Sequence, residues 1–136
     1  MQKNELSKIQ AVAFMGVLGF IGLADISLPL KIVFYTSFVY FLYFLFYYKI
    51  KKEGQDERMI FNFKKAQTFA FKTAWVIPLS ACITSAFGVL DIYHAVAYKE
   101  VDLSYFYRLF FASAFALAEV TLVVSTIISF YYYEKQ

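Results

Sequence analysis

Long stretches of apolar residues dominate this chain and restrict its fold more than any other feature of the sequence. Most are close to the length of about 17 to 25 residues that crosses a bilayer as an α-helix. They are apolar throughout rather than alternating with polar residues, which favours helices over a membrane β-barrel. We expect four transmembrane spans at about residues 9–28, 32–48, 73–95 and 105–130, with a connection over residues 49–72.

The composition supports an all-α integral membrane protein. Hydrophobic residues make up 61% of the chain, whereas soluble domains usually have about 45 to 50% apolar residues. Four spans leave only short connections, so we predict a four-helix bundle that forms a single transmembrane domain over residues 1–136. The first 24 residues also have the basic and apolar outline of a secretory signal peptide, which is an alternative to the first span.

Positive charge is concentrated on one side of the predicted spans. Ten of the 13 Lys and Arg residues lie in the N-terminal tail, in 49–72 or at the C-terminus, and the others are Lys31, Lys99 and Arg108. Because cytoplasmic loops carry the excess of positive charge, we predict a multi-pass protein of the cell membrane with both termini cytoplasmic. Basic residues beside apolar spans are typical of contact with anionic lipid, so we expect the lipid bilayer, and no nucleic acid, as a partner.

Glu119 is the sharpest chemical feature within the spans. A charged residue at the centre of a span costs about 2.5 to 3.5 kcal/mol to insert, so Glu119 should face the interior and either find partners or keep its proton. With antiparallel third and fourth spans, Ser80, Thr84 and Ser85 lie roughly level with Glu119. We predict their hydroxyls, or Tyr40 or Tyr43 of the second span, as its partners. Glu119 is then either a proton- or cation-coupling carboxylate or a neutral residue that fixes helix register.

Small residues in the first span predict close helix packing. Gly16, Gly19 and Gly22 recur at every third position, and the missing side chains let another helix approach closely. The second span is bulky and aromatic, so its rings are expected either to face lipid or to fill this groove.

The sequence has no motif typical of an enzyme, a metal site or a cofactor site. One histidine, His94, and one cysteine, Cys82, occur without a regular ligand spacing. No Ser-His-Asp order and no Gly-rich phosphate loop is present. We therefore expect neither a metal nor a cofactor, and catalysis is not predicted.

A polar stretch precedes the third span. From Asp56 onward no Gly or Pro occurs before Pro78, and apolar residues recur at three- and four-residue steps, which predicts a helix that is either separate or continuous with that span. Acidic residues at its start suit the positive end of a helix. Either the polar side chains form a docking face for a partner, or they form an ordinary lipid-facing surface. The candidate docking residues are Asp56, Glu57, Arg58, Asn62 and Lys65.

The segment DERMIFNFKKAQTFAF resembles a pattern in a family of small bacterial four-helix membrane proteins of unknown function. The pattern is Asp-Glu-Arg, three residues, Asn, two residues, Lys-Ala, three residues, Ala-Phe. Here it is carried by Asp56, Glu57, Arg58, Asn62, Lys65, Ala66, Ala70 and Phe71. VLGFIGLAD, residues 17–25, is similar to the family's first span, and the resemblance covers about the first two thirds of the chain. It implies the four-helix topology and an accessory role, and no catalytic activity.

Two functions follow from these features as expectations. The first is a non-enzymatic accessory membrane protein that binds another membrane component, either a membrane protein or a second copy, in a regulatory, export-associated or self-protection role. The second is a small oligomeric proton- or cation-coupled transporter or channel that uses Glu119. The polar stretch favours the first function and Glu119 favours the second.

The charge distribution makes a testable prediction of orientation. In a Cys82→Ser background, a cysteine at Gly54 should be protected from an impermeant thiol reagent added outside intact cells, whereas a cysteine at Lys99 should react, because positive residues stay in the cytoplasm. Labelling of Gly54 from outside would reverse the predicted orientation.

Overall fold

The computed structural model describes residues 2–52 and 57–135, with side chains from Ser7 onward. Asp56 therefore lies outside the described residues. All regular structure in these ranges is helical. The α-helices are α1 (Gln2–Phe14), α2 (Leu28–Thr36), α3 (Tyr43–Lys52), α4 (Glu57–Ala86), α5 (Val89–Ala97) and α6 (Leu103–Glu134). Two 3₁₀ helices, η1 (Met15–Leu23) and η2 (Ser37–Leu42), follow α1 and α2 without a break.

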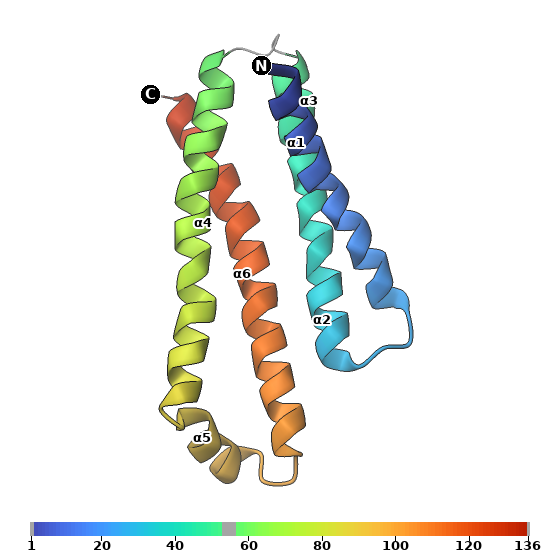
Figure 1. Ribbon diagram of the computed structural model, residues 1–136, viewed down its shortest axis with the longest axis vertical. Coiled ribbons are helices and arrows are strands. Elements are labelled where there is room, and N and C mark those ends of the chain that lie inside the picture. Colours follow the sequence, from blue (N-terminus) through green and yellow to red (C-terminus); the bar gives the residue numbers. More distant parts are fainter. Residues whose placement is uncertain (1, 53–56, 136) are drawn as a thin grey trace.

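The helices form two antiparallel hairpins (Figure 1). One hairpin pairs α1 and η1 with α2, η2 and α3, and the other pairs α4 with α6. α5 caps one end of the second hairpin, and the start of α1 and the end of α6 lie at the opposite end. The hairpins contact each other where α2 and η2 pack against α6.

Three helices are long and apolar enough to cross a membrane, namely Leu28–Lys52, Glu57–Ala86 and Leu103–Glu134. The apolar helix Ser7–Leu23 is shorter. The all-α prediction is therefore confirmed, and the three long helices suggest a multi-pass membrane protein.

The ends of the first two helices differ from the predicted spans 9–28 and 32–48. The first helix ends at Leu23 instead of continuing to Leu28, and Leu28 begins the next helix. Pro29 lies in the first turn of α2, where its fixed φ and missing N–H suit a helix start. Asp25 is fully exposed in the turn between them, as expected for a carboxylate that favours water.

The polar stretch is continuous with the third apolar helix, so the predicted connection 49–72 belongs largely to α3 and α4. At its other end α4 stops at Ala86 rather than continuing to residue 95. Gly88 has a φ of 67°, a left-handed conformation that glycine adopts without strain and that ends helices. The chain then turns into the separate helix α5, and Asp102 caps α6 by accepting a hydrogen bond from Ser104 N at 2.9 Å.

Glycines and aromatic rings interlock along the first hairpin. A methyl group added at Gly19 would lie 2.6 Å from the Phe38 ring, and one at Gly16 would lie 2.8 Å from the Phe41 ring. A methyl group added at Gly22 would lie 3.2 Å from the Tyr35 ring. The glycines recur every third residue, and a 3₁₀ helix has three residues per turn, so η1 aligns all three on one face. Of the two alternatives for the aromatic helix, Tyr35, Phe38 and Phe41 therefore follow the second and fill the glycine groove.

The two hairpins share an aromatic core near the end that holds the chain termini. Phe46 of α3, Phe63 of α4 and Phe130 of α6 meet with ring centroids 5.1, 5.1 and 6.1 Å apart. Tyr43, almost fully buried, packs against Phe63 and shares a hydrogen bond of 3.2 Å with Thr126. Ile9 brings α1 into the same cluster. This core holds four of the helices together at one end of the bundle.

The fit of Gly19 against Phe38 can be tested by adding one carbon. Gly19→Ala should lower the thermal stability of the detergent-purified protein, because overpacking costs about 1 to 3 kcal/mol, although alanine is intrinsically the better helix former. Phe38→Leu in the same chain should recover part of the loss. Val17→Ile, which adds one carbon at an exposed position of the same helix, is the matched control and should change little. A Gly19→Ala variant as stable as the wild type would contradict the interlocked packing.

Candidate functional site

Glu119 lies on α6, half-buried, where the two hairpins meet. The hydroxyl of Thr36, the last residue of α2, donates a hydrogen bond to Glu119 Oε2 at 2.6 Å. This contact joins the first hairpin to the second. The carboxyl group therefore faces the interior of the bundle, as predicted for a charged residue within an apolar span.

The hydroxyls of α4 were wrong as partners of Glu119, because its hydrogen-bond partner comes from α2. Tyr40, one of the two tyrosines also predicted, lines the same groove as Glu119. Ser80 donates to its own helix at Ile77 O, at 2.7 Å, and Thr84 does so at Ala81 O, at 2.9 Å. These two hydroxyls line a separate groove opposite Ser113, and Ser85 is likewise not a partner of Glu119. The helix α5 takes up residues that were assigned to the third span, which shifts the register of α4 against α6. As a result Pro78 and Ala74 of α4 line the same groove as Glu119.

The groove beside Glu119 has a volume of about 250 Å³ and is apolar apart from the carboxyl group and one tyrosine. Its walls come from η2, α4 and α6, and include Tyr40, Phe71, Ala74, Trp75, Pro78 and Ala118. Only Oε2 of Glu119 is bonded, to Thr36. No buried side-chain oxygen among the described residues lacks a partner, so the unbonded Oε1 is not sealed in the core. The groove thus has the Glu119 side chain on an otherwise largely apolar wall.

The Thr36 hydrogen bond offsets only part of the cost of placing Glu119 in an apolar helix. A charged residue at the centre of a span costs about 2.5 to 3.5 kcal/mol, and a hydrogen bond to a charged group returns about 1.5 to 3 kcal/mol of this. The Thr36 hydroxyl has a second hydrogen-bond acceptor, because it also lies 2.8 Å from Val33 O of its own helix. Removing Glu119 would therefore not leave this hydroxyl without a partner. Glu119 is therefore a poor structural residue for the isolated chain and a good candidate for binding.

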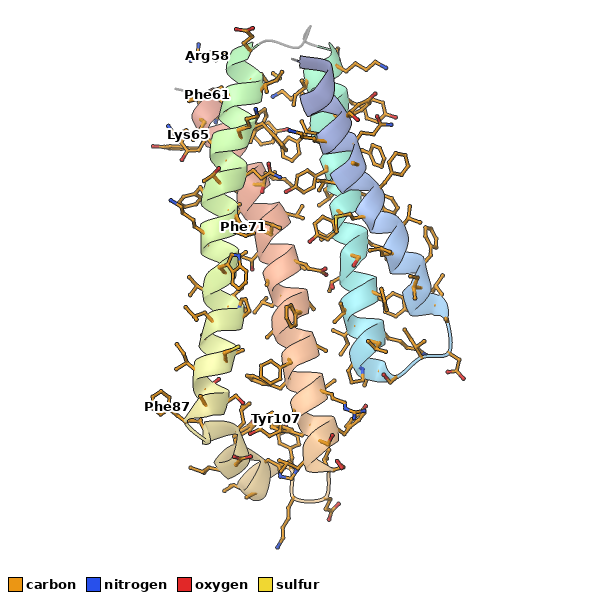
Figure 2. All side chains as sticks on the ribbon, in the orientation of Figure 1. Arg58, Phe61, Lys65, Phe71, Phe87 and Tyr107 are labelled. Atoms are coloured by element: carbon orange, nitrogen blue, oxygen red, sulfur yellow. The ribbon has the colours of Figure 1, made fainter. Side chains whose placement is uncertain are left out.

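Two of the candidate docking residues contact the chain itself. Asn62 Nδ2 donates to the backbone oxygen of Tyr133 at 3.2 Å, and Lys65 Nζ lies 4.3 Å from the centre of the Tyr133 ring. Both contacts brace the start of α4 against the end of α6. Glu57 and Arg58 are exposed in the first turn of α4, and Arg58 projects near the end of the bundle in Figure 2. Asp56 lies outside the described residues, so the docking face predicted for these five residues stays a prediction.

His94 contacts the connection after α5 and the first turn of α6. His94 Nε2 lies 2.6 Å from Val101 O, and its ring packs 5.3 Å from that of Phe106. Cys82 is exposed on α4. Within residues 2–52 and 57–135, no group of three or more His, Cys, Asp or Glu side chains is arranged to hold a metal ion.

Comparison with known protein families, with curated proteins and with solved structures finds no match. The resemblance of the Asp56–Phe71 segment to a family of small membrane proteins therefore stays a prediction.

Sequence reasoning missed Thr36 and reached Glu119 without its true partner. A usable signal was present, because Thr36 and Ser37 are the only hydroxyl residues of the second span other than tyrosines. Such a polar pair in an aromatic helix is a plausible partner for an acid in another span.

The energetic argument predicts that Glu119 can be removed without loss of stability. Glu119→Leu should leave the thermal stability of the detergent-purified protein unchanged or raised, because the lost hydrogen bond is weaker than the cost of burying the carboxyl group. Thr126→Val is the matched contrast, since it leaves the buried Tyr43 hydroxyl without its partner and should cost about 1 to 3 kcal/mol. Destabilisation by Glu119→Leu as large as that of Thr126→Val would identify Glu119 as a structural residue.

Proposed function

We propose that this chain is a non-enzymatic accessory membrane protein that binds another membrane component through the groove at Glu119. The observation that carries the proposal is a carboxyl group within an apolar helix that has one hydrogen bond, at 2.6 Å, on a residue that lines an apolar groove of about 250 Å³. An intramembrane ionisable residue of this kind is a candidate functional site.

A transmembrane helix of a partner protein is the occupant that best fits this groove. Ala74 and Ala118 on its walls remove bulk and let a helix backbone approach closely, as small residues do at helix contacts in membranes. The unbonded Glu119 oxygen would accept a hydrogen bond from a hydroxyl, amide or basic side chain at matching depth. Trp75 adds a large aromatic contact surface to the wall. A second copy of this chain with such a donor is one form of this partner.

The rest of the proposal concerns location and role. The chain would lie in the cell membrane with both termini in the cytoplasm, on the charge distribution described above. Glu57 and Arg58, exposed at the cytoplasmic start of α4, would add a second contact with the same partner, next to Asp56 in the sequence. Regulation, export and self-protection against a membrane-active peptide are the roles that suit such a protein.

Coupled transport is the second candidate function, because the unbonded Glu119 oxygen could also exchange a proton or a cation. The aromatic core argues against transport by one chain. Phe46, Phe63 and Phe130 fill the space between the helices near the end that holds the termini, so a path through one chain would be closed. Transport would then need an oligomer with a path between copies.

Site-specific photocrosslinking in native membranes tests the accessory function. A benzoylphenylalanine at Phe115, which lines the groove, should give a discrete protein crosslink, whereas one at Ile128, exposed elsewhere on α6, should give only lipid adducts. Ala118→Leu should abolish the crosslink because it fills the groove, and Ala86→Leu, the same change at an exposed position outside it, should not.

Two outcomes would contradict this function. Equal protein crosslinking at Phe115 and Ile128 would mean that the groove is not a specific surface. Dissipation of a proton gradient by the wild-type protein in liposomes, abolished by Glu119→Gln, would favour transport, since glutamine keeps the shape of the side chain and removes its ionisation.

A further inference from the structure

A second groove, away from Glu119, is lined by lysines on α4. Its volume is about 440 Å³, and its walls include Phe61, Lys64, Lys65, Thr68, Lys72 and Tyr133. Phe61 and Lys65 lie near the end of α4 that is close to the chain termini (Figure 2). This groove is therefore at the level where α4 leaves the predicted apolar span.

The spacing of the lysines brings their charges to one face. Lys65, Thr68 and Lys72 are three and four residues apart, and Lys64 is four residues before Thr68, so all lie along one side of the helix. No carboxylate of the described residues lines the groove. Glu134, the acid next to Tyr133 in the sequence, is held by Lys49 at 2.5 Å. The groove therefore concentrates positive charge without an acidic side chain in its walls.

The depth of the groove matches the headgroup region of a bilayer. α4 has 30 residues and, at about 1.5 Å per residue, is about 45 Å long, whereas the hydrocarbon core is about 30 Å thick. A helix of this length can project beyond the core, and the exposed charged residues Glu57 and Arg58 at the start of α4 favour projection of that end. Tyr131, Tyr132 and Tyr133 lie at the end of α6 beside it, and tyrosines of this kind concentrate at the membrane interface. Lys72 lies further along α4, but its long side chain can extend its amine toward the headgroup region.

We propose that this groove is a binding site for the headgroup of an anionic phospholipid. The phosphate lies among the ammonium groups of Lys64, Lys65 and Lys72, and the acyl chains run along the exposed rings of Phe61 and Phe69. The aromatic walls favour a lipid over a free phosphate ion, because an ion has no apolar part to place against them. The site does not depend on Glu119 or on the function proposed for it.

Native mass spectrometry of the full chain in detergent tests this site. The wild type should retain dioleoyl phosphatidylglycerol over dioleoyl phosphatidylcholine, and each lysine should contribute about fivefold to that ratio. Lys64→Gln/Lys72→Gln should lower the ratio about 25-fold. Lys51→Gln/Lys52→Gln removes the same charge at exposed positions of α3 and should leave the ratio unchanged. If the first pair does not elute as a folded protein, Lys72→Gln alone should lower the ratio about fivefold.

Three outcomes would overturn the proposal. An unchanged ratio in the Lys64→Gln/Lys72→Gln variant, or in Lys72→Gln where that variant replaces it, would show that these lysines do not bind the headgroup. An equal loss in the Lys51→Gln/Lys52→Gln variant would indicate general surface charge and no site. Displacement of phosphatidylglycerol by millimolar sodium phosphate, compared with sodium chloride of equal ionic strength, would assign the groove to free phosphate.

Discussion

The packing of Phe46, Phe63 and Phe130 is the interaction on which the rest of this bundle depends. Lipid tails are as apolar as these side chains, so helix association in a membrane relies on shape fit and hydrogen bonds rather than on the hydrophobic effect. Rings from three helices meet edge to face or tilted, with centroids as close as 5.1 Å, an arrangement worth about 0.5 to 1.5 kcal/mol per pair beyond its contact area. This core joins the two hairpins near the termini, and the groove at Glu119 lies beyond it.

The helical class could be predicted from the sequence because it depends on apolar run length, which is local information. The ends of the helices were harder. Gly88 ends α4 through a left-handed backbone conformation, and a single glycine in an apolar run does not reveal whether the chain will turn there. Ser80 and Thr84 were placed level with Glu119 for the same reason, since the turn through α5 sets which residues of α4 lie level with those of α6.

Two residues of the polar stretch before the third span also have a role within the chain. Asn62 and Lys65, both candidate docking residues, contact Tyr133. Antiparallel third and fourth spans bring the end of α6 to the level of this stretch, but the sequence does not indicate which side chains meet there. By contrast, the spacing of Gly16, Gly19 and Gly22 predicted close packing correctly, because a period of three is a property of one segment alone.

The 3₁₀ winding of η1 links the fold to the thickness of the bilayer. Its nine residues rise about 2.0 Å each rather than about 1.5 Å, so they extend about 18 Å where an α-helix would extend about 13 to 14 Å. Rewinding η1 as an α-helix would shorten the segment and would also rotate the glycines away from the rings that fill them, since residues three apart would no longer be eclipsed. Placed in a thinner membrane, this hairpin would therefore adapt by tilting and not by contracting, which would couple its packing to hydrophobic thickness.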